Sequence, residues 1–428
     1  MLNKLIPYVL LLKERYPRLY TRIVGLARRH LGDRLGSYPK LMAGEIAAVQ
    51  KVLSGSQWNM TAGRGLPHEH LEEALAKYIG VPFAIAVNSG GMALQMSMRA
   101  LGVNPGEEVL HQVDTCSATA LAVAAAAATP LFADISPDTL MLSVKSAEDW
   151  VGPRTKAVIA SHMWGAPEDM PSILELGRRH NLPVIEDACL SLGALADGKM
   201  AGAHGLVGCF SFGCNKPIQC GEGGMIVTSD ESLARELRAM RHWGDQTIEY
   251  GVRDMKTPAW NGRLSEILAA IIIEQLKGYP RHLADLQNAV ADFQHFLQRI
   301  DGLELALGVA KTPAECAFTQ VTLRLDETLL RRSKTEIKDG LYARGIPVWH
   351  ANFEPINSLS LFASDRWKNW MPKADHERIS RNYSTVFTVA QQVYDHGGLG
   401  LGKMNFLSKQ NLEHLKTQIE AVCRKVQA

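Results

Sequence analysis

The residues best suited to chemistry lie in three short segments, each of which follows an apolar run. Residues 89–91 (Ser-Gly-Gly) open a helical pattern, Asp187 ends a strand-like run, and Lys216 comes shortly after another. Small residues before a helix let backbone N–H groups approach an anion, which the helix N-terminus also favours. A carboxylate beside a pyridine nitrogen keeps that nitrogen protonated, and a shielded lysine amine can act as a nucleophile.

Each segment has a second reading when it is taken alone. Glycines often only turn the chain, an aspartate after a strand often caps a helix, and a lone lysine is usually solvated. The order of the three is more specific, because it is the order expected of a pyridoxal-phosphate (PLP) site on a parallel sheet, where a protonated pyridinium serves as the electron sink. The sequence therefore predicts that Lys216 holds PLP as a Schiff base and that Asp187 pairs with its ring nitrogen.

The elements that must position these residues alternate between apolar runs and amphipathic stretches. Continuous apolar strands separated by helices predict a mostly parallel sheet covered on both faces. In such sheets the functional residues gather beyond the carboxyl ends of the strands. We expect strands at 83–87, 108–112, 129–135, 156–162, 182–187, 207–212 and 224–228, and helices at 91–102, 116–128, 170–180 and 231–242.

The pattern changes at residues 278–280 (Gly-Tyr-Pro), where one helix from Arg263 to about Leu276 ends and a second, about 281–299, begins. A strand near 317–325 and helices near 333–344 and 410–425 follow, which indicates a smaller α+β domain. The 428 residues suit two domains. We expect a basic amphipathic arm at residues 1–34, a large PLP-binding α/β domain at 35–277 and a small C-terminal domain at 278–428.

As an ordered set, these motifs resemble the DegT/DnrJ/EryC1/StrS family of sugar aminotransferases, which have the aspartate-aminotransferase fold type I. The resemblance runs from about Ala43 to the C-terminus and leaves out the N-terminal arm. The segments that carry it are residues 88–94, 161–165, 185–188, 211–216, 221–224, 241–244 and 261–266.

The resemblance implies a role for each matching residue. Lys216 would form the Schiff base and Asp187 would bind the pyridinium. Asn261 matches the residue that reaches the phosphate from the neighbouring subunit in this family, which implies a homodimer with active sites at its interface. The other phosphate contacts would come from Ser89, Gly90, Gly91 and Ser211.

Four positions depart from the family pattern. Gly91 replaces a threonine, and Cys116 occupies the place of an aromatic ring that commonly stacks on the cofactor. Leu190 replaces a polar residue that contacts the cofactor's phenolic oxygen. The histidine-containing segment of the small domain appears only loosely, around His350. The first three remove contacts to the cofactor that the family pattern would supply. The fourth leaves the identity of the substrate undetermined.

The resemblance implies amino transfer, in which glutamate or glutamine displaces Lys216 from PLP and the freed amine moves the proton. A keto-sugar would accept the nitrogen. If this acceptor is nucleotide-linked, Arg263 would face its phosphates, and His350 is the candidate for contact with the sugar.

Three alternatives stay open. Dehydratases of the family typically carry histidine in place of Lys216, so the lysine counts against dehydration. Aromatising amine synthases keep the lysine. A non-catalytic PLP-binding regulatory protein is the third alternative, against which the presence of both Lys216 and Asp187 counts.

The composition excludes several classes of protein. A net charge of +2 argues against a protein that mainly binds the nucleic-acid backbone. The seven cysteines include no CxxC pair, so neither a metal site nor a disulfide framework is expected, and a reducing cytoplasm fits best.

The first 34 residues carry eight Lys or Arg against two acids. The apolar run at 5–12 is too short to span a bilayer, and no cleavage site for a secretory signal follows it. A basic amphipathic helix after Pro17 either packs on the protein or a partner subunit, or lies on an anionic membrane surface. We expect a cytoplasmic protein, with peripheral membrane contact through residues 1–34 as the open alternative.

Overall fold

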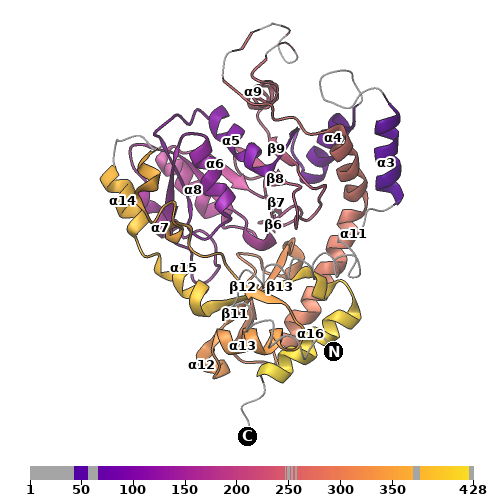
Figure 1. Ribbon diagram of the computed structural model, residues 1–428, viewed down its shortest axis with the longest axis vertical. Helices are drawn as coiled ribbons and strands as arrows, with labels where there is room; N and C mark the ends of the chain where they lie inside the picture. The colour runs from indigo at the N-terminus through magenta and orange to yellow at the C-terminus, as the bar shows by residue number, and fades with distance from the viewer. Residues whose placement is uncertain are drawn as a thin grey trace, which may run out of the picture.

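The computed structural model shows a large and a small sheet, each with its own helices (Figure 1). The arm expected at residues 1–34 lies outside the described residues, so its packing and its membrane contact remain predictions. Within the part of the chain that is described, no helix has both the length and the apolar character needed to cross a membrane. The described residues are 43–55, 66–245, 247, 251, 254–255, 258–369 and 376–423.

Seven strands form the large sheet, in the spatial order β1-β9-β8-β5-β4-β2-β3. β9 pairs antiparallel with β1 and β8, and the other four pairs are parallel, so the mostly parallel sheet is confirmed. The strands, all close to their expected positions, are β1 (Phe83–Val87), β2 (Glu108–Gln112), β3 (Thr129–Ala133), β4 (Thr155–Ser161), β5 (Val184–Asp187), β8 (Val207–Ser211) and β9 (Gly224–Thr228). The helices around them are α3 (Ala43–Ser54), α4 (Pro67–Ile79), α5 (Gly90–Ala100), α6 (Ser117–Ala125), α7 (Val144–Trp150), α8 (Met170–His180), α9 (Glu231–Arg241) and α11 (Glu266–Leu297).

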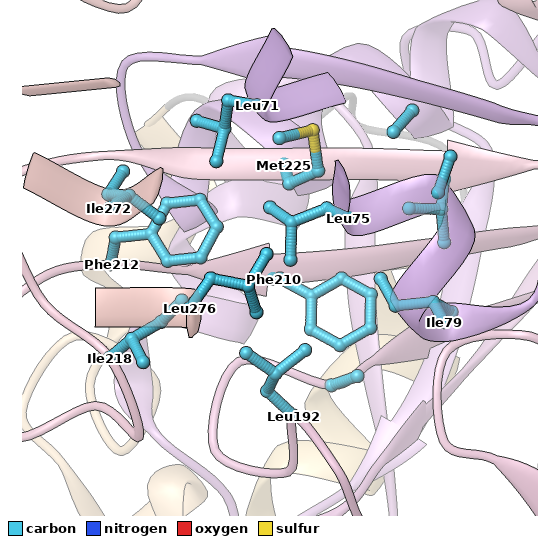
Figure 2. Packing of buried hydrophobic residues seen from close by; sticks show 14 of the residues in the cluster. Leu71, Leu75, Ile79, Leu192, Phe210, Phe212, Ile218, Met225, Ile272 and Leu276 are labelled. Carbon is cyan, nitrogen blue, oxygen red and sulfur yellow. The ribbon is translucent and has the colours of Figure 1, made fainter. Parts of the chain in front are cut away.

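Helices cover both faces of this sheet, as buried parallel strands require. On one face, Phe210 of β8 packs in a cluster with α4 and α11, and Figure 2 shows it with Leu75 and Leu276 from these helices. On the other face, Ile185 and Cys209 pack in a cluster with α5 and α9. Burying each leucine or phenylalanine contributes about 1.5–3 kcal/mol, so both faces hold the strand ends in place.

α11 runs without a break through Pro280, so the helix end expected at residues 278–280 is wrong. A proline inside a helix removes one backbone hydrogen bond and costs about 3 kcal/mol. Tertiary packing offsets this cost, because Leu276 and Tyr279 are buried and Tyr279 Oη donates to Leu192 O at 2.6 Å. The domain bounds expected at 35–277 and 278–428 remain predictions.

A four-stranded antiparallel sheet forms the smaller α+β part, in the order β10-β11-β13-β12. Leu323 and Leu399 on one face of it are buried in a second core with the C-terminal half of α11 and two further helices, α13 and α16. The strand and the two helices expected here are therefore confirmed. The elements are β10 (Leu303–Leu305), β11 (Gln320–Leu325), β12 (Val348–His350), β13 (Gly398–Gly402), α12 (Glu327–Leu330), α13 (Lys334–Tyr342) and α16 (Lys409–Cys423).

The chain between β12 and β13 returns to the large sheet through α14 (His376–Ser384) and α15 (Thr388–Gln392), which lie beside it in Figure 1. Asn382 Nδ2 donates to Phe132 O and Tyr383 Oη donates to Pro130 O, each at 2.9 Å. The two sheets are thus tied together by α11 and by this returning segment.

Candidate active site

A cleft lies at the carboxyl ends of β4, β5 and β8, where parallel sheets usually place their sites. Among the predicted site residues, Ser89, Asn261, Arg263 and His350 do not line it. The predicted residues that the structure brings together in its lining are Gly90, Gly91, Cys116, Asp187, Leu190, Ser211 and Lys216, with Thr115, Thr119, Ser161, His162 and Cys189 beside them.

The first turn of α5 forms one wall of the cleft. Ser89 caps this helix, because its Oγ accepts a hydrogen bond from the N–H three residues later at 3.1 Å. A Cβ at Gly90 would lie 2.8 Å from both Cys189 Sγ and Ser211 Cβ, so only glycine fits. A Cβ at Gly91 would have its nearest neighbour at 4.0 Å. The space beside Gly91 and the positive end of the helix dipole favour an anion here.

Asp187, the last residue of β5, presents its carboxylate to the cleft. Its Oδ2 accepts a hydrogen bond from Thr119 Oγ1 at 2.7 Å, and its Oδ1 accepts one from Cys189 N at 3.2 Å. Donors from two different elements therefore fix the direction of this carboxylate. A fixed negative charge of this kind favours a cation in the cleft.

Glu186 faces the other side of the sheet, because side chains alternate along a strand. Its carboxylate accepts hydrogen bonds from Gly202 N, Gly205 N and His162 Nε2 at 2.6–2.9 Å. Burial by itself raises the pKa of Glu186, but the hydrogen bond and charge of His162, with the backbone N–H groups, lower this pKa overall. Glu186 thus holds the loop after β5 and is turned away from the cleft.

Ser161 stands beside Asp187 in the register of β4 and β5 and lines the cleft. Its Oγ is buried and has no hydrogen-bond partner among the described residues. A buried hydroxyl that is left unpaired costs about 1–3 kcal/mol. A polar group on a ligand in the cleft would remove this cost.

Lys216 lies half-buried on the loop between β8 and β9, at the cleft wall. Asn215 before it adopts a φ of +67°, which turns the chain, and its N donates to Gln219 Oε1 at 3.1 Å. Two hydrogen bonds of 2.8 Å join the backbone of Gln219 to the side chain of Gln275 on α11. The lysine is therefore carried by a loop that is fixed to the large domain.

Asn261 and Arg263 lie beside residues 87–88, which precede α5. Asn261 is exposed, and its backbone O accepts a hydrogen bond from Asn88 Nδ2 at 3.2 Å. The guanidinium of Arg263 lies 4.0 Å from the centre of the Trp243 ring, and its Nη1 lies 3.5 Å from His242 Nδ1. Asn261 is thus exposed and Arg263 half-buried, and neither lines the cleft of its own chain.

His350 ends β12 in the small domain. Its ring stacks on Tyr394 with centroids 4.6 Å apart, and its Nδ1 lies 3.1 Å from Tyr394 O. Burial, followed by the charge of Lys334, lowers the pKa of His350. The ring is therefore neutral near pH 7 and is held beside Tyr394.

Comparison with known proteins identifies the kind of enzyme to which this cleft belongs. The chain matches the DegT/DnrJ/EryC1/StrS aminotransferase family over residues 39–381. It belongs to this family. The motif resemblance and the enzyme class expected from the sequence are therefore confirmed.

Individual relatives agree with this assignment. The chain is 39% identical to the GDP-perosamine synthase of Caulobacter vibrioides over 297 residues, which are 68% of this chain and 78% of the relative. It is 36% identical to the UDP-N-acetyl-3-dehydro-alpha-D-glucosamine 3-aminotransferase of Acidithiobacillus ferrooxidans over 318 residues, 72% of this chain and 81% of that protein. The crystal structure of DesV from S. venezuelae has a TM-score of 0.75 at 28% identity and covers 91% of this chain and 96% of its own. Fold type I is thus confirmed, and the dehydratase, aromatising and non-catalytic alternatives are not favoured.

Three departures from the family pattern lie in the cleft lining, at Gly91, Cys116 and Leu190. Gly91 and Cys116 carry smaller side chains than the threonine and the ring of the family resemblance, and Leu190 offers no hydrogen bond. At these three positions the lining is therefore smaller or more apolar than the family pattern expected from the sequence.

Four residues that sequence reasoning missed contact the predicted ones: Thr119 and Cys189 bond Asp187, Ser161 lies beside it, and Lys403 Nζ donates to Lys216 O at 3.3 Å. The hydroxyl of Thr119 in the first turn of a helix that otherwise continues with alanine, leucine and valine is a signal that could have identified it. Lys403 has no such signal, because 187 residues separate it from Lys216. Across the described ranges, no group of three or more His, Cys, Asp or Glu is placed to hold a metal ion.

Proposed function

We propose that this protein is a PLP-dependent aminotransferase that moves an amino group onto a nucleotide-linked keto-sugar. The observation that supports it best is the meeting of the α5 N-terminus, Asp187 and Lys216 in one cleft. An anion-binding wall, a fixed carboxylate and an amine are the three groups needed by a phosphorylated pyridine aldehyde.

The residues present fit PLP. The phosphate would lie at the first turn of α5, where the absence of a side chain at Gly90 permits close packing and Ser211 lies opposite. The carboxylate of Asp187 would face the ring nitrogen, and Lys216 Nζ would hold the aldehyde carbon. The unpaired Oγ of Ser161 would meet a polar substituent of the ring. Bound there, PLP supplies an electron sink for bonds at the amine-bearing carbon of the substrate.

The side chains of the protein supply the rest of the chemistry. With PLP bound and an amino donor in place of Lys216, the free Nζ of Lys216 would take a proton from the donor carbon and return a proton to the second substrate. Asp187 would keep the ring nitrogen of bound PLP charged, because an adjacent negative charge favours the cation. Thr119 and Cys189 keep this carboxylate in position through their hydrogen bonds.

The nature of the acceptor rests on the relatives, two of which are named for GDP- and UDP-linked sugars. We propose a nucleotide-linked keto-sugar as acceptor and glutamate or glutamine as donor. Arg263, whose guanidinium is held over the Trp243 ring, is the candidate for the phosphates of the nucleotide. His350 is the candidate for contact with the sugar.

A homodimer would complete the site. Asn261 is exposed and lies outside the cleft of its own chain, as expected of a residue that serves a second copy. Ile46 and Leu53 on α3 are 47% and 45% exposed and offer an apolar surface for such contact. The cytoplasmic location, and the arm at residues 1–34 as a contact with the partner subunit or with an anionic membrane, are part of this proposal.

The proposal is tested by the visible absorption spectrum of the purified protein with PLP, before and after L-glutamate is added. We expect a yellow band from lysine-bound PLP that bleaches with glutamate and is absent from unliganded Lys216→Ala. The exposed Lys199 provides a matched control, because Lys199→Ala should behave like the wild type. A band that ignores both glutamate and glutamine would contradict amino transfer, and absence of any band would contradict PLP binding.

A further inference from the structure

Lys403 brings the small domain into contact with the residue that is proposed to hold the cofactor. It follows β13 directly, and its Nζ donates to the backbone O of Lys216 at 3.3 Å. The backbone on either side of Lys403 is held in place, because Leu401 is buried in the small-domain core and Asn405 Nδ2 donates to Gly402 O at 3.0 Å. The ammonium group therefore reaches Lys216 from a rigid base.

The loop that carries Lys216 has its other anchor on α11. Gln219 exchanges two hydrogen bonds with Gln275, both 2.8 Å long. The peptide of Lys216 is therefore held between the large domain on one side and Lys403 on the other. Because the orientation of a peptide group sets the direction of the side chain on the same residue, a contact at Lys216 O affects where Lys216 Nζ can lie.

The surroundings of Lys403 leave its amine charged near neutral pH. Burial lowers the pKa of Lys403 to about 8, so the amine is still largely charged at pH 7. His282 on α11 faces the same space, and burial followed by the charge of Lys403 lowers the pKa of His282. A hydrogen bond from a charged donor in such a confined place is stronger than a neutral one.

We infer that Lys403 is a positioning residue, which orients Lys216 toward the cleft and couples the seating of the small domain to the amine that holds the cofactor. This role in the reaction rests on the proposed function, whereas the effect on the loop does not. The alternative is that Lys403 only packs the two domains together.

Lys334 provides a matched control. It is a buried lysine of the same domain, its Nζ donates to Val393 O at 3.3 Å, and burial lowers its pKa to about 8 as well. It does not line the cleft and bonds no residue of the Lys216 loop. If these lysines only pack the small domain, replacing either Lys403 or Lys334 should disturb the structure equally. If Lys403 positions Lys216, only its replacement should affect the Lys216 loop.

The experiment compares Lys403→Met, Lys403→Arg and Lys334→Met in the full chain without added cofactor, by hydrogen–deuterium exchange read by mass spectrometry. We expect about tenfold faster exchange in the peptide that covers residues 212–221 for Lys403→Met, as loss of one charge-assisted hydrogen bond implies. Lys403→Arg should restore part of the protection, and Lys334→Met should leave this peptide unchanged. If Lys403→Met cannot be purified, Lys403→Gln takes its place. Equal exchange in the wild type and Lys403→Met would overturn the inference.

The second readout is the pH titration of the band of lysine-bound PLP. Because loss of a nearby positive charge favours the protonated form of a cation, Lys403→Met should raise the midpoint of this titration and slow bleaching by glutamate about tenfold. An unchanged midpoint and rate would overturn the coupling to the cofactor. If the wild type forms no band while exchange still responds, the loop contact is upheld and the proposed function is what fails.

Discussion

β5 sends one carboxylate to each side of the large sheet, and the two sides use it differently. An ionised carboxylate can accept about four hydrogen bonds. Glu186 receives four, from His162 Nε2 and the backbone N–H groups of Gly202, His204 and Gly205. Among the described residues, Asp187 receives two, from Thr119 Oγ1 and Cys189 N, and the rest of its carboxylate faces the cleft. Asp187 can therefore still accept hydrogen bonds from a ligand, whereas the carboxylate of Glu186 is fully used within the protein. The two residues differ in this remaining acceptor capacity and not in their charge.

The largest expected effect on this comparison comes from Asp187→Asn. An adjacent carboxylate shifts the pKa of a cation by about 1–3 units, so its loss should lower kcat/KM by about 10- to 1000-fold. The free energy of unfolding should change little, because the amide oxygen can still accept from Cys189 N and the Thr119 hydroxyl can accept from the amide N–H. Steady-state kinetics and urea unfolding of the same preparations measure both quantities. Unchanged kcat/KM would contradict the assignment of Asp187 to the ring nitrogen.

Glu186→Gln should have the opposite profile. The amide has one acceptor oxygen, so several backbone donors and His162 would lose their partner, at a cost of about 3–5 kcal/mol for a broken buried pair. Urea unfolding should show this loss, while the cofactor band of the folded fraction stays in place. Glu175→Gln is the matched control, because the exposed ion pair of Glu175 with Arg178 contributes little. A stable Glu186→Gln would show that the difference between the two acids is not structural.

Much of this arrangement could be predicted from the sequence, because the strands are short apolar runs whose ends fix the places of Asp187 and Lys216. The contacts that hold these residues could not. The bonds from Thr119 and Lys403 join segments 68 and 187 residues apart and depend on tertiary packing. The same is true of Pro280, whose local preference for a helix end is overruled by the burial of its neighbours.

His111 is a buried residue whose pKa is affected by the charge of Asp187, so it tests the Asp187 side of the comparison. Burial lowers the pKa of His111 to about 4, against smaller raising effects from its bond to Gln112 O and from Asp187. In the unfolded chain His111 is protonated below about pH 6.5, whereas in the folded chain it stays neutral down to about pH 4. The contribution of neutral His111 to the free energy of unfolding is therefore complete above pH 6.5 and is lost as the pH falls toward 4. We expect about 3 kcal/mol of lost unfolding free energy from this residue. Urea unfolding from pH 7 to 4 should show a flatter decline for His111→Gln, and an equal decline would contradict this.

The smallest expected effect concerns His350 in the small domain. Its ring contacts Tyr394 and does not line the cleft that contains Asp187. If His350 contacts the sugar, one neutral hydrogen bond is at stake, so His350→Ala should raise KM for the acceptor by about threefold to tenfold. The bleaching by glutamate should be unchanged, because the first half of the reaction does not involve the sugar. His396→Ala is the control, since His396 is exposed and pairs with Glu327 at 3.3 Å. A KM that is equal in the wild type and both variants would assign His350 to the Tyr394 stack alone.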